Sequence, residues 1–331
     1  MSRLETHAQA MLGSGLGVYY PLQPHHPAQL APFGQLVARG YADRLWLGES
    51  LALGTHQVLA YLAGQGISPA LGIGVSLMPL HDPYQAALAA RSLAALSGKP
   101  LTSVFGTSKP SYVAALRGAS YASPLTAARE YMSTVRRLLD NQPVVPQGEY
   151  VHTRAQLPLG LAAPHVDVGL GVLRPGMARV AADTADVALT WMTPLPYLRR
   201  DLLPVLMGVR VISVVPVLVV RPGLEVDEVI WRATHSHVGE GHYRAMLTAA
   251  GLGPIADGPA FARALVDHGV VLAGSPQTVA DEIERYWAAG VDEVVLNPTA
   301  LETEGPEAAL RDLLEITEVC RSRGSAREQD T

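Results

Sequence analysis

Two residue types that often carry chemistry are scarce in this chain. Its 331 residues include one cysteine, Cys320, and only two lysines, Lys99 and Lys109. A single cysteine excludes an internal disulfide framework and any cysteine-based zinc cluster. The formal net charge of −5 argues against a nucleic-acid partner.

Long apolar segments are also missing. The longest, from Leu202 to Val220, is interrupted by Pro204, Arg210 and Pro216, so it predicts a helix end and a buried strand rather than a membrane span. No apolar segment of the signal-peptide type opens the chain. We therefore expect a soluble, cytoplasmic protein with no membrane partner and with a frayed polar tail at residues 322–331.

Eight short apolar segments predict β-strands. Val, Ile and Leu occupy both alternating positions in them, which is typical of parallel strands that are buried on two faces. The predicted strands are Gly15–Tyr20, Arg44–Leu47, Ala70–Leu77, Leu101–Phe105, Val166–Val172, Asp186–Thr190, Val211–Val219 and Glu293–Leu296.

Amphipathic segments separate these strands and predict helices. Their apolar residues recur three and four positions apart, which places them on one face of a helix. The predicted helices are Ala28–Arg39, Pro83–Leu96, Pro124–Leu139, Pro175–Thr184, Pro276–Ala289 and Glu307–Val319.

The alternation of strands and helices predicts one α/β domain over residues 1–331, a (β/α)8 TIM barrel. The alternative is a doubly wound sheet, which usually carries GxGxxG after its first strand, whereas this chain has YYPLQPHHP there. Two insertions are expected. Asn141–Pro164 follows the fourth strand as a small hairpin or lid loop, and Arg221–Leu272 follows the seventh strand.

In a barrel of this kind the active site lies at the carboxyl ends of the strands. Glu49 follows the strand that ends in RLWLG and is the candidate catalytic residue; its alternative role is an ion pair with an arginine such as Arg91. Among the strand-end residues, Tyr20, Ser50 and Trp191 are candidates for substrate contact. The remaining strand-end positions are Ser76, Gly106, Thr107, Gly171–Met177, Thr190 and Asn297.

Glycines and an arginine indicate where a cofactor could bind. Gly72 and Gly74 lie inside the strand ALGIGVSL, which indicates either tight packing in the barrel or a flat ring resting on the backbone. The turn GVLRPGM places Arg174 at the start of a helix, where backbone amides favour an anion such as phosphate.

Histidines are frequent in the loops. His25 and His26 in the first loop and His81 in the third are candidates for substrate contact. His235 and His237 could form a metal pair, but residues two positions apart on a helix do not share a face and no cysteine lies nearby. The sequence therefore predicts no metal site.

Four segments together resemble the luciferase-like superfamily of flavin- and deazaflavin (F420)-dependent oxidoreductases. They occur in the order and spacing typical of that family and span most of the chain. The segments are GYADRLWLGES, ALGIGVSLMPLHDPYQAALAARSLAALSGKPLTSVFGTS, AREYMSTVRRLLDNQPVVPQGEY and LAGSPQTVADEIERYWAAGVDEVVLNP.

The resemblance implies a barrel that holds the tricyclic ring of F420, or alternatively of FMN, at the strand ends. It also implies a non-proline cis peptide near Gly74–Val75 or Val75–Ser76, behind the ring. The implied ring contacts are Gly74, Val75, Ser76, Gly106 and Thr107. The segment that matches the family's phosphate-binding turn consists of Val172, Leu173, Arg174, Pro175, Gly176 and Met177.

The sequence departs from the family at the positions that handle protons. Many F420 enzymes of the family have Asp-His at the end of the second strand, where this chain has Glu49-Ser50. Many also carry a glutamate after the fourth-strand glycine, and FGTSKPSY contains none. The proton chemistry of the family's sugar-phosphate and alcohol dehydrogenases is therefore not supported. The fourth helix and LGES resemble actinobacterial F420-dependent reductases more than FMN monooxygenases.

The resemblance implies an enzyme that uses reduced F420 to deliver hydride to an activated C=C bond or a similar acceptor, in the tailoring of a peptide natural product. The alternatives are an FMN-dependent luciferase-like monooxygenase and a non-catalytic barrel that only binds a ligand. The apolar and aromatic loops favour a neutral or mixed small-molecule or peptide substrate. Because family members are often homodimers, the resemblance also implies a homodimer.

Overall fold

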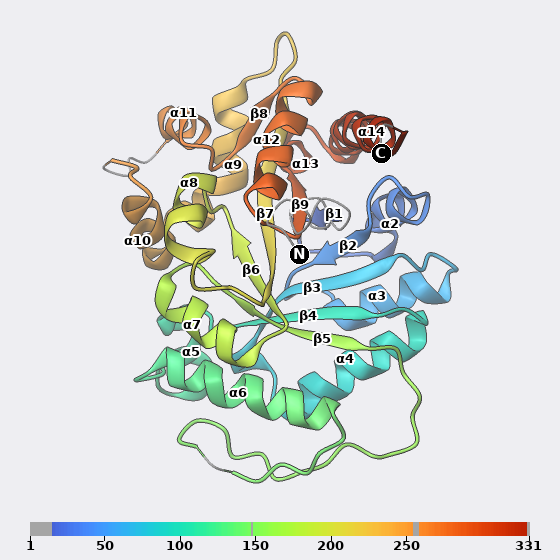
Figure 1. Ribbon diagram of the computed structural model, residues 1–331, viewed down its shortest axis with the longest axis vertical. Helices are drawn as coiled ribbons and strands as arrows, with labels where there is room; N and C mark the ends of the chain where they lie inside the picture. Colours follow the sequence, from blue (N-terminus) through green and yellow to red (C-terminus); the bar gives the residue numbers. More distant parts are fainter. Residues whose placement is uncertain (1–14, 147, 254–257, 330–331) are drawn as a thin grey trace.

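The computed structural model describes residues 15–146, 148–253 and 258–329, and their strands form a closed parallel barrel surrounded by helices (Figure 1). Neighbours around the barrel follow the order β1-β2-β3-β4-β5-β6-β7-β9, and β9 pairs with β1 to close it. The predicted (β/α)8 barrel is therefore confirmed. Its strands are β1 Gly15–Tyr20, β2 Arg44–Leu47, β3 Ala70–Leu77, β4 Leu101–Gly106, β5 Val166–Gly171, β6 Val187–Trp191, β7 Arg210–Val219 and β9 Glu293–Pro298.

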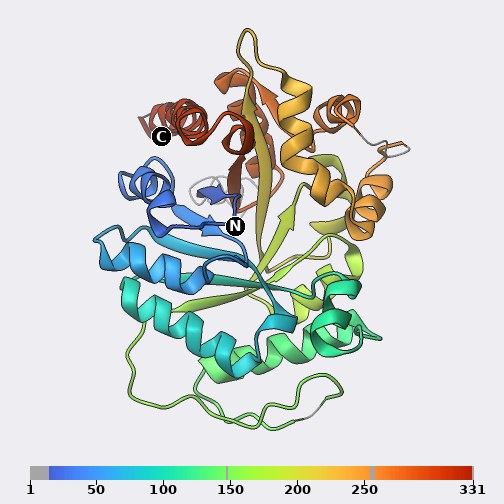
Figure 2. The same cartoon turned by 180° about the vertical axis from the view of Figure 1, so that it is seen from behind.

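The helices cover the outside of the barrel in both views (Figures 1 and 2). Proline at the first or second position starts many of them, because that position needs no hydrogen-bond donor. The helices are α2 Ala31–Ala38, α3 Thr55–Gly64, α4 Pro83–Ser97, α5 Pro110–Arg117, α6 Pro124–Leu139, α7 Pro175–Thr184, α8 Leu195–Tyr197 with the π-turn Leu198–Leu202, α9 Val226–Val238, α10 Gly241–Ala249, α11 Ala260–Asp267, α12 Pro276–Ala288, α13 Ala300–Thr303 and α14 Pro306–Gln329. Two short 3-10 turns, Pro27–Gln29 and Met78–Leu80, precede α2 and α4.

A ninth strand, β8 (Leu272–Gly274), was not predicted. It pairs with Val217–Val219 of β7, beyond the point where β6 stops pairing with β7 at Val214. β8 therefore extends the sheet at the barrel mouth without joining the barrel itself. Its three residues are too few to show any periodicity in the sequence.

Two insertions occur where the sequence predicts them. After β4, helices α5 and α6 precede a long segment, which contains one antiparallel bridge between Val144 and Ala155 and runs along the bottom of the molecule in Figure 1. After β7, helices α9, α10 and α11 precede β8. The hairpin expected in the first insertion is therefore reduced to this single antiparallel bridge.

The last helix differs from the expected frayed tail. α14 continues to Gln329, and the Arg323 guanidinium contacts Asp281 at 2.7 Å and Glu284 at 3.4 Å on α12. These ion pairs attach the chain end to the barrel wall as far as Arg323, so residues 322 and 323 do not form a loose tail. None of the helices in the described residues combines the length and apolar character needed to span a membrane.

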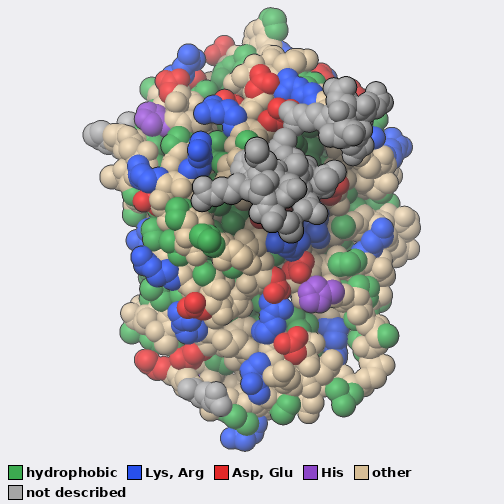
Figure 3. All heavy atoms as spheres, in the orientation of Figure 1, with side chains coloured by type: hydrophobic (Ala, Val, Ile, Leu, Met, Phe, Trp, Pro, Cys, Tyr) green, Lys and Arg blue, Asp and Glu red, His purple; other side chains and the backbone are tan. Residues whose placement is uncertain are grey.

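Side chains fill the interior of the barrel. Tyr19, Trp46, Val104, Leu189 and Val295 are among the buried residues there, and a larger apolar core lies between the strands and the helices. Lys, Arg, Asp and Glu side chains are interspersed over the face drawn in Figure 3. That face therefore presents no broad surface of one charge.

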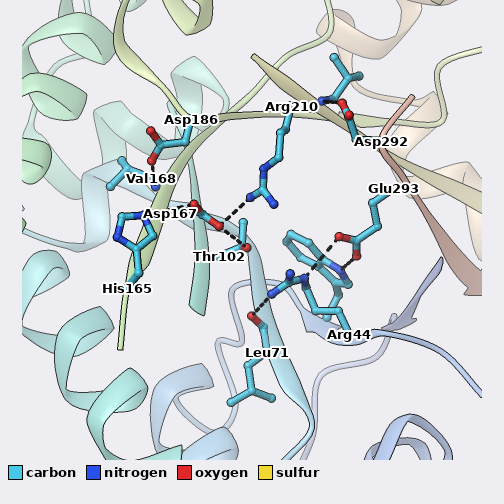
Figure 4. Close-up of polar contacts among 12 residues, drawn as sticks. Arg44, Leu71, Thr102, His165, Asp167, Val168, Asp186, Arg210, Asp292 and Glu293 are labelled. Atoms are coloured by element: carbon cyan, nitrogen blue, oxygen red, sulfur yellow. Dashed lines mark hydrogen bonds and ion pairs between the residues drawn. The ribbon is translucent and has the colours of Figure 1, made fainter. Parts of the chain in front are cut away.

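Charged residues lie at the amino ends of the strands, opposite the mouth (Figure 4). The Glu293 carboxylate accepts hydrogen bonds from Trp46 Nε1 at 2.6 Å and from Arg44 Nε at 3.3 Å. Burial raises the pKa of Glu293, and the Arg44 guanidinium opposes that rise. These contacts compensate a charge that the interior would otherwise exclude.

A second group at this end could in principle bind a metal ion. Potential ligand atoms of His165, Asp167 and Asp186 lie within 4.8 Å of one another. However, Asp167 is paired with Arg210 at 2.6 Å (Figure 4). Asp186 is paired with Arg136. We therefore assign these carboxylates to the stability of the barrel.

Candidate active site at the barrel mouth

Several polar atoms at the carboxyl ends of the strands are buried without a hydrogen-bond partner among the residues that the structure describes. Buried polar atoms are paired in the great majority of cases, so a group of unpaired atoms in one place indicates a ligand site. The unpaired atoms are Ser50 Oγ after β2, His56 Nε2 at the start of α3, Ser76 Oγ in β3, Trp191 Nε1 in β6 and Asn297 Oδ1 in β9.

Glu49 lies in this group and has specific polar partners. Its Oε2 atom accepts a hydrogen bond from the Leu77 N–H at 3.0 Å and contacts His81 Nε2 at 2.9 Å. Its side chain is only 11% exposed, and that of His81 is 29% exposed. The alternative ion pair with Arg91 is not formed, because the Arg91 guanidinium donates to the Pro158 carbonyl instead.

His56, which the sequence did not single out, is a further candidate residue beside this pair. Burial, with a smaller contribution from the neighbouring His81, lowers its pKa to about 4, although Glu49 acts in the opposite direction. His56 is therefore neutral at pH 7. The Glu49–His81 pair and this unpaired imidazole form the most polar part of the mouth.

Backbone geometry at the end of β3 agrees with the resemblance. The Gly74–Val75 peptide bond is cis, as expected, and the pairing of β3 with β4 shifts register between Gly74 and Ser76. The Tyr19 hydroxyl donates to the Gly74 carbonyl at 3.0 Å. This contact joins β1 to the irregular part of β3.

The glycines of β3 lie where a side chain would meet the packed interior of the barrel. A Cβ atom on Gly72 would lie 2.3 Å from the Trp46 ring, and one on Gly74 would lie 2.8 Å from Leu189 Cδ1. Both positions therefore face the packed barrel interior, which supports the tight-packing interpretation.

The Val75 side chain lies beside two glycines, Gly106 and Gly171. A Cβ atom on Gly106 would lie 2.9 Å from Val75 Cγ2, and one on Gly171 would lie 3.0 Å from Val75 Cγ1. The two glycines at the ends of β4 and β5 therefore make room for this valine. Val75 therefore presents its side chain beside Gly106. Thr107, which follows Gly106 in the chain, is partly buried.

Aromatic side chains line the opposite part of the mouth. The Trp191 ring meets Tyr19 edge-on at 4.6 Å between centroids and stacks on His237 at 5.4 Å with an interplanar angle of 23°. Tyr243 meets the other side of His237 at 5.4 Å. Burial, together with His242 and His235, lowers the pKa of His237 to about 4. The imidazole is therefore neutral and suited to aromatic packing.

Of the predicted substrate contacts in and after β1, Tyr20 points away from the mouth, whereas His25 and His26 lie in the loop that follows the strand. Tyr20 packs edge-on against Phe33 at 5.2 Å in the outer core, so its neighbour Tyr19 is the tyrosine at the mouth. The His25 and His26 side chains are exposed, and His26 Nδ1 accepts a hydrogen bond from the Ala28 N–H at the start of a 3-10 turn. From the same loop, Gln23 contacts the Glu49 carbonyl at 3.3 Å.

The predicted anion-binding turn connects β5 to α7. Arg174 is the residue before the helix, and Pro175 occupies its first position, followed by Gly176 and Met177. Val172 donates its N–H to the Leu189 carbonyl, and the Leu173 carbonyl accepts from the Tyr197 hydroxyl, so the turn is held on both sides.

A cation and an imidazole lie near this turn. Lys109, after β4, contacts Glu240 at 2.6 Å across the mouth. Burial lowers the pKa of His242, with Arg174 and Lys109 contributing in the same direction. Because Lys109 is paired and the lowered pKa favours neutral His242, Arg174 is the group nearest the start of α7 that could pair with an anion.

Comparisons with known proteins agree with this geometry. The model of the luciferase-like monooxygenase family matches residues 10–205. No curated protein sequence matches the chain.

Solved structures with the same fold include enzymes with different cofactors. The F420-dependent tetrahydromethanopterin reductase from Methanopyrus kandleri is 19% identical, with a TM-score of 0.68 over 92% of this chain and 97% of that one. An F420-dependent secondary alcohol dehydrogenase is 13% identical, with a TM-score of 0.73 over 93% and 99%. The EDTA monooxygenase from Chelativorans sp. BNC1 is 17% identical, with a TM-score of 0.66 over 94% of each chain. At these identities the likeness establishes the fold alone.

Proposed function

The chain belongs to the luciferase-like monooxygenase family, and from this premise we propose that it is an oxidoreductase that uses reduced F420 to transfer hydride to an activated C=C bond or a similar acceptor. The observation that carries the proposal is the Glu49–His81 pair at the barrel mouth. Hydride addition to such a bond leaves a carbanion or enolate, which needs a proton to complete the reduction. An imidazole held by a carboxylate can supply that proton.

The Glu49–His81 pair takes the place of the adjacent Asp-His residues that this sequence lacks. The resemblance implies Asp-His in adjacent positions, and this chain has Ser50 where the histidine would be. His81 brings an imidazole to Glu49 from the loop after β3 instead. This arrangement favours proton transfer at a strand end where the sequence had argued against it.

The mouth also has the features needed to hold a deazaflavin. The polar atoms of Ser50, Ser76, Trp191 and Asn297 that are unpaired within the described part of the chain are free to form hydrogen bonds with a ligand. Val75 lies where an apolar contact to a flat ring is needed, and the Val172–Met177 turn with Arg174 would hold a phosphate. Reduced F420 would supply the hydride.

The protein side chains have separate tasks in this proposal. His81 donates the proton to the acceptor, and Glu49 keeps the imidazole oriented by accepting its hydrogen bond. Trp191, stacked on His237, covers the mouth with aromatic surface and excludes water from it. The apolar and aromatic lining favours a neutral or mixed acceptor, including a residue of a peptide natural product.

The second candidate is an FMN-dependent monooxygenase. The family description and the fold shared with EDTA monooxygenase favour it. The two candidates differ in the cofactor and in the need for oxygen. A monooxygenase reduces O2 and inserts one of its atoms, whereas the proposed reductase consumes no oxygen.

Titration of the purified protein with F420 and, separately, with FMN tests the proposal. We expect saturable F420 binding, measured from the quenching of deazaflavin fluorescence, and at least about tenfold weaker FMN binding. With reduced F420 and an enone under anaerobic conditions, the absorbance of oxidised F420 should appear. Preferential FMN binding with oxygen-dependent turnover would support the monooxygenase instead, and binding of neither cofactor would contradict both candidates.

A further inference from the structure

A second hollow lies beside the barrel mouth and belongs to the first insertion. It has a volume of about 280 Å³ and is enclosed by the start of α4, the end of α5, the first half of α6 and residues 150–153. We call it the rim pocket. Its chemically distinctive lining residues are Asp82, Arg117, Tyr121, Tyr131, Tyr150 and His152.

The wall contributed by the insertion is fixed by one carboxylate. Glu130, on α6, accepts hydrogen bonds from the backbone N–H groups of Glu149 at 2.9 Å, Tyr150 at 2.8 Å and Val151 at 3.1 Å. A Cβ atom on Gly148 would lie 2.0 Å from the Glu130 carboxyl carbon, so only glycine permits this close approach. The segment is therefore held in place before any ligand binds.

Further hydrogen bonds join this wall to the rest of the pocket. The Tyr150 hydroxyl accepts from the Ser123 N–H at 3.0 Å, and Thr153 donates to Asp82 Oδ2 at 3.1 Å. The other Asp82 oxygen accepts from the Tyr84 N–H at 2.8 Å. Both Asp82 oxygens thus accept hydrogen bonds from residues of the pocket wall.

The remaining chemistry of the pocket is aromatic and cationic. The rings of Tyr121 and Tyr150 meet edge-on at 5.5 Å between centroids, and the Arg117 guanidinium lies 5.8 Å from the centroid of the Tyr121 ring. Within the described part of the chain, Arg117 has no carboxylate within 4.0 Å. An aromatic pocket whose guanidinium has no ion-pair partner among the described residues favours an aromatic ligand that carries a negative charge.

We propose that the rim pocket is a second ligand site, which binds a flat aromatic group bearing a carboxylate. The tyrosine rings would pack against the ligand ring, and Arg117 would pair with its carboxylate. Tyr131 connects this site to the mouth, because its hydroxyl donates to the carbonyl of His81 at 3.1 Å while the His81 imidazole contacts Glu49. Binding at the rim pocket requires neither a bound cofactor nor the redox reaction proposed above.

Calorimetric titration of the full-length protein with 3-(4-hydroxyphenyl)propionate, and with the corresponding neutral amide, tests this site. We expect one carboxylate molecule to bind per chain and the amide to bind at least about fivefold more weakly. Arg117→Gln should abolish the difference between the two probes, and Tyr121→Leu should weaken both. In Gly148→Ala, which displaces the wall from Glu130, the affinity for the carboxylate should fall as well.

Two controls show whether the probes bind in the rim pocket rather than elsewhere on the molecule. Arg129→Gln removes an exposed guanidinium of α6 that is paired with Asp183, so it should leave both affinities unchanged. Circular dichroism melting curves show whether each variant is folded. The proposal is overturned if neither probe binds at millimolar concentration, or if folded Arg117→Gln and Tyr121→Leu bind the carboxylate as the unchanged protein does.

Discussion

Glu49 illustrates how one side chain can be prepared for chemistry by groups far apart in the sequence. Its carboxylate receives a backbone N–H from Leu77 in β3 and an imidazole from His81 in the following loop. Its own N–H donates to the Val75 carbonyl at 3.1 Å. These three contacts fix the carboxylate against the irregular end of β3, beside the position proposed for the cofactor ring.

Replacing Glu49 with glutamine should lower turnover with reduced F420 at least about tenfold, equivalent to about 1.4 kcal/mol. The amide has the same shape but is a weaker, uncharged acceptor for the His81 imidazole. Steady-state kinetics and the melting temperature should be measured on the same preparation. Glu318→Gln, an exposed α14 variant, is the control. A lower melting temperature with unchanged kinetics would remove Glu49 from the site.

For single residues, the sequence predicts some members of the candidate site but not the residues that they contact. The position of Glu49 after a strand was sufficient to select it, whereas its contact with His81 depends on the conformation of an intervening strand and turn. Tyr19 and Tyr20 are chemically identical neighbours that point to opposite sides of β1, so composition could not distinguish them. His56 escaped notice because it lies within a helix rather than directly after a strand.

At the scale of elements, β3 shows how a barrel strand makes room for its neighbours. Trp46 on β2 is fully buried, and its ring occupies the space beside Gly72. Val75 in turn occupies the space beside Gly106 and Gly171. Large side chains thus alternate with glycines around the barrel, which packs its interior while leaving the strands at their regular spacing.

Gly72→Ala should lower the free energy of unfolding by about 2–3 kcal/mol, because the added methyl group would overlap the Trp46 ring. Gly64→Ala, at the end of α3, is a matched control, since a Cβ atom there meets nothing within 4 Å. That variant should be neutral or stabilised by up to about 1 kcal/mol. Urea unfolding measures both changes, and equal stability of the two variants would refute the packing argument.

The elements could be predicted well where the chain has long periodic segments. The bounds of β1, β2, β3, α6 and α7 agree with those expected from the sequence. The short strand β8 and the full length of α14 could not be predicted in this way. The first has only three residues, and the second is polar in its last turns and is held partly by ion pairs of Arg323 with another helix.

At the scale of the whole molecule, the two ends of the barrel differ in whether their buried polar groups have partners. At the amino ends, Glu293, Asp167 and Asp186 are each paired with an arginine. At the mouth, several buried polar atoms have no partner within the described residues, and His56 and His237 are held neutral by burial. The paired end stabilises the fold, whereas the unpaired end remains available to a ligand.

The buried histidines make the stability of the molecule depend on pH. The pKa values of His56 and His237 fall from 6.5 to about 4 on folding, so between these values the unfolded chain binds more protons than the folded one. The free energy of unfolding must therefore decrease as the pH falls from 7 to 5. Each histidine contributes at most about 2 kcal/mol to that decrease at pH 5.

His237→Phe should make this decrease smaller by up to about 2 kcal/mol, because phenylalanine keeps the stacking on Trp191 and has no group to protonate in the unfolded chain. Urea unfolding followed by circular dichroism at pH 7 and pH 5 measures the effect. His268→Phe, at the end of α11 and exposed, is the control and should keep the full decrease. If both variants lose stability equally between pH 7 and pH 5, the pKa of His237 is not lowered on folding.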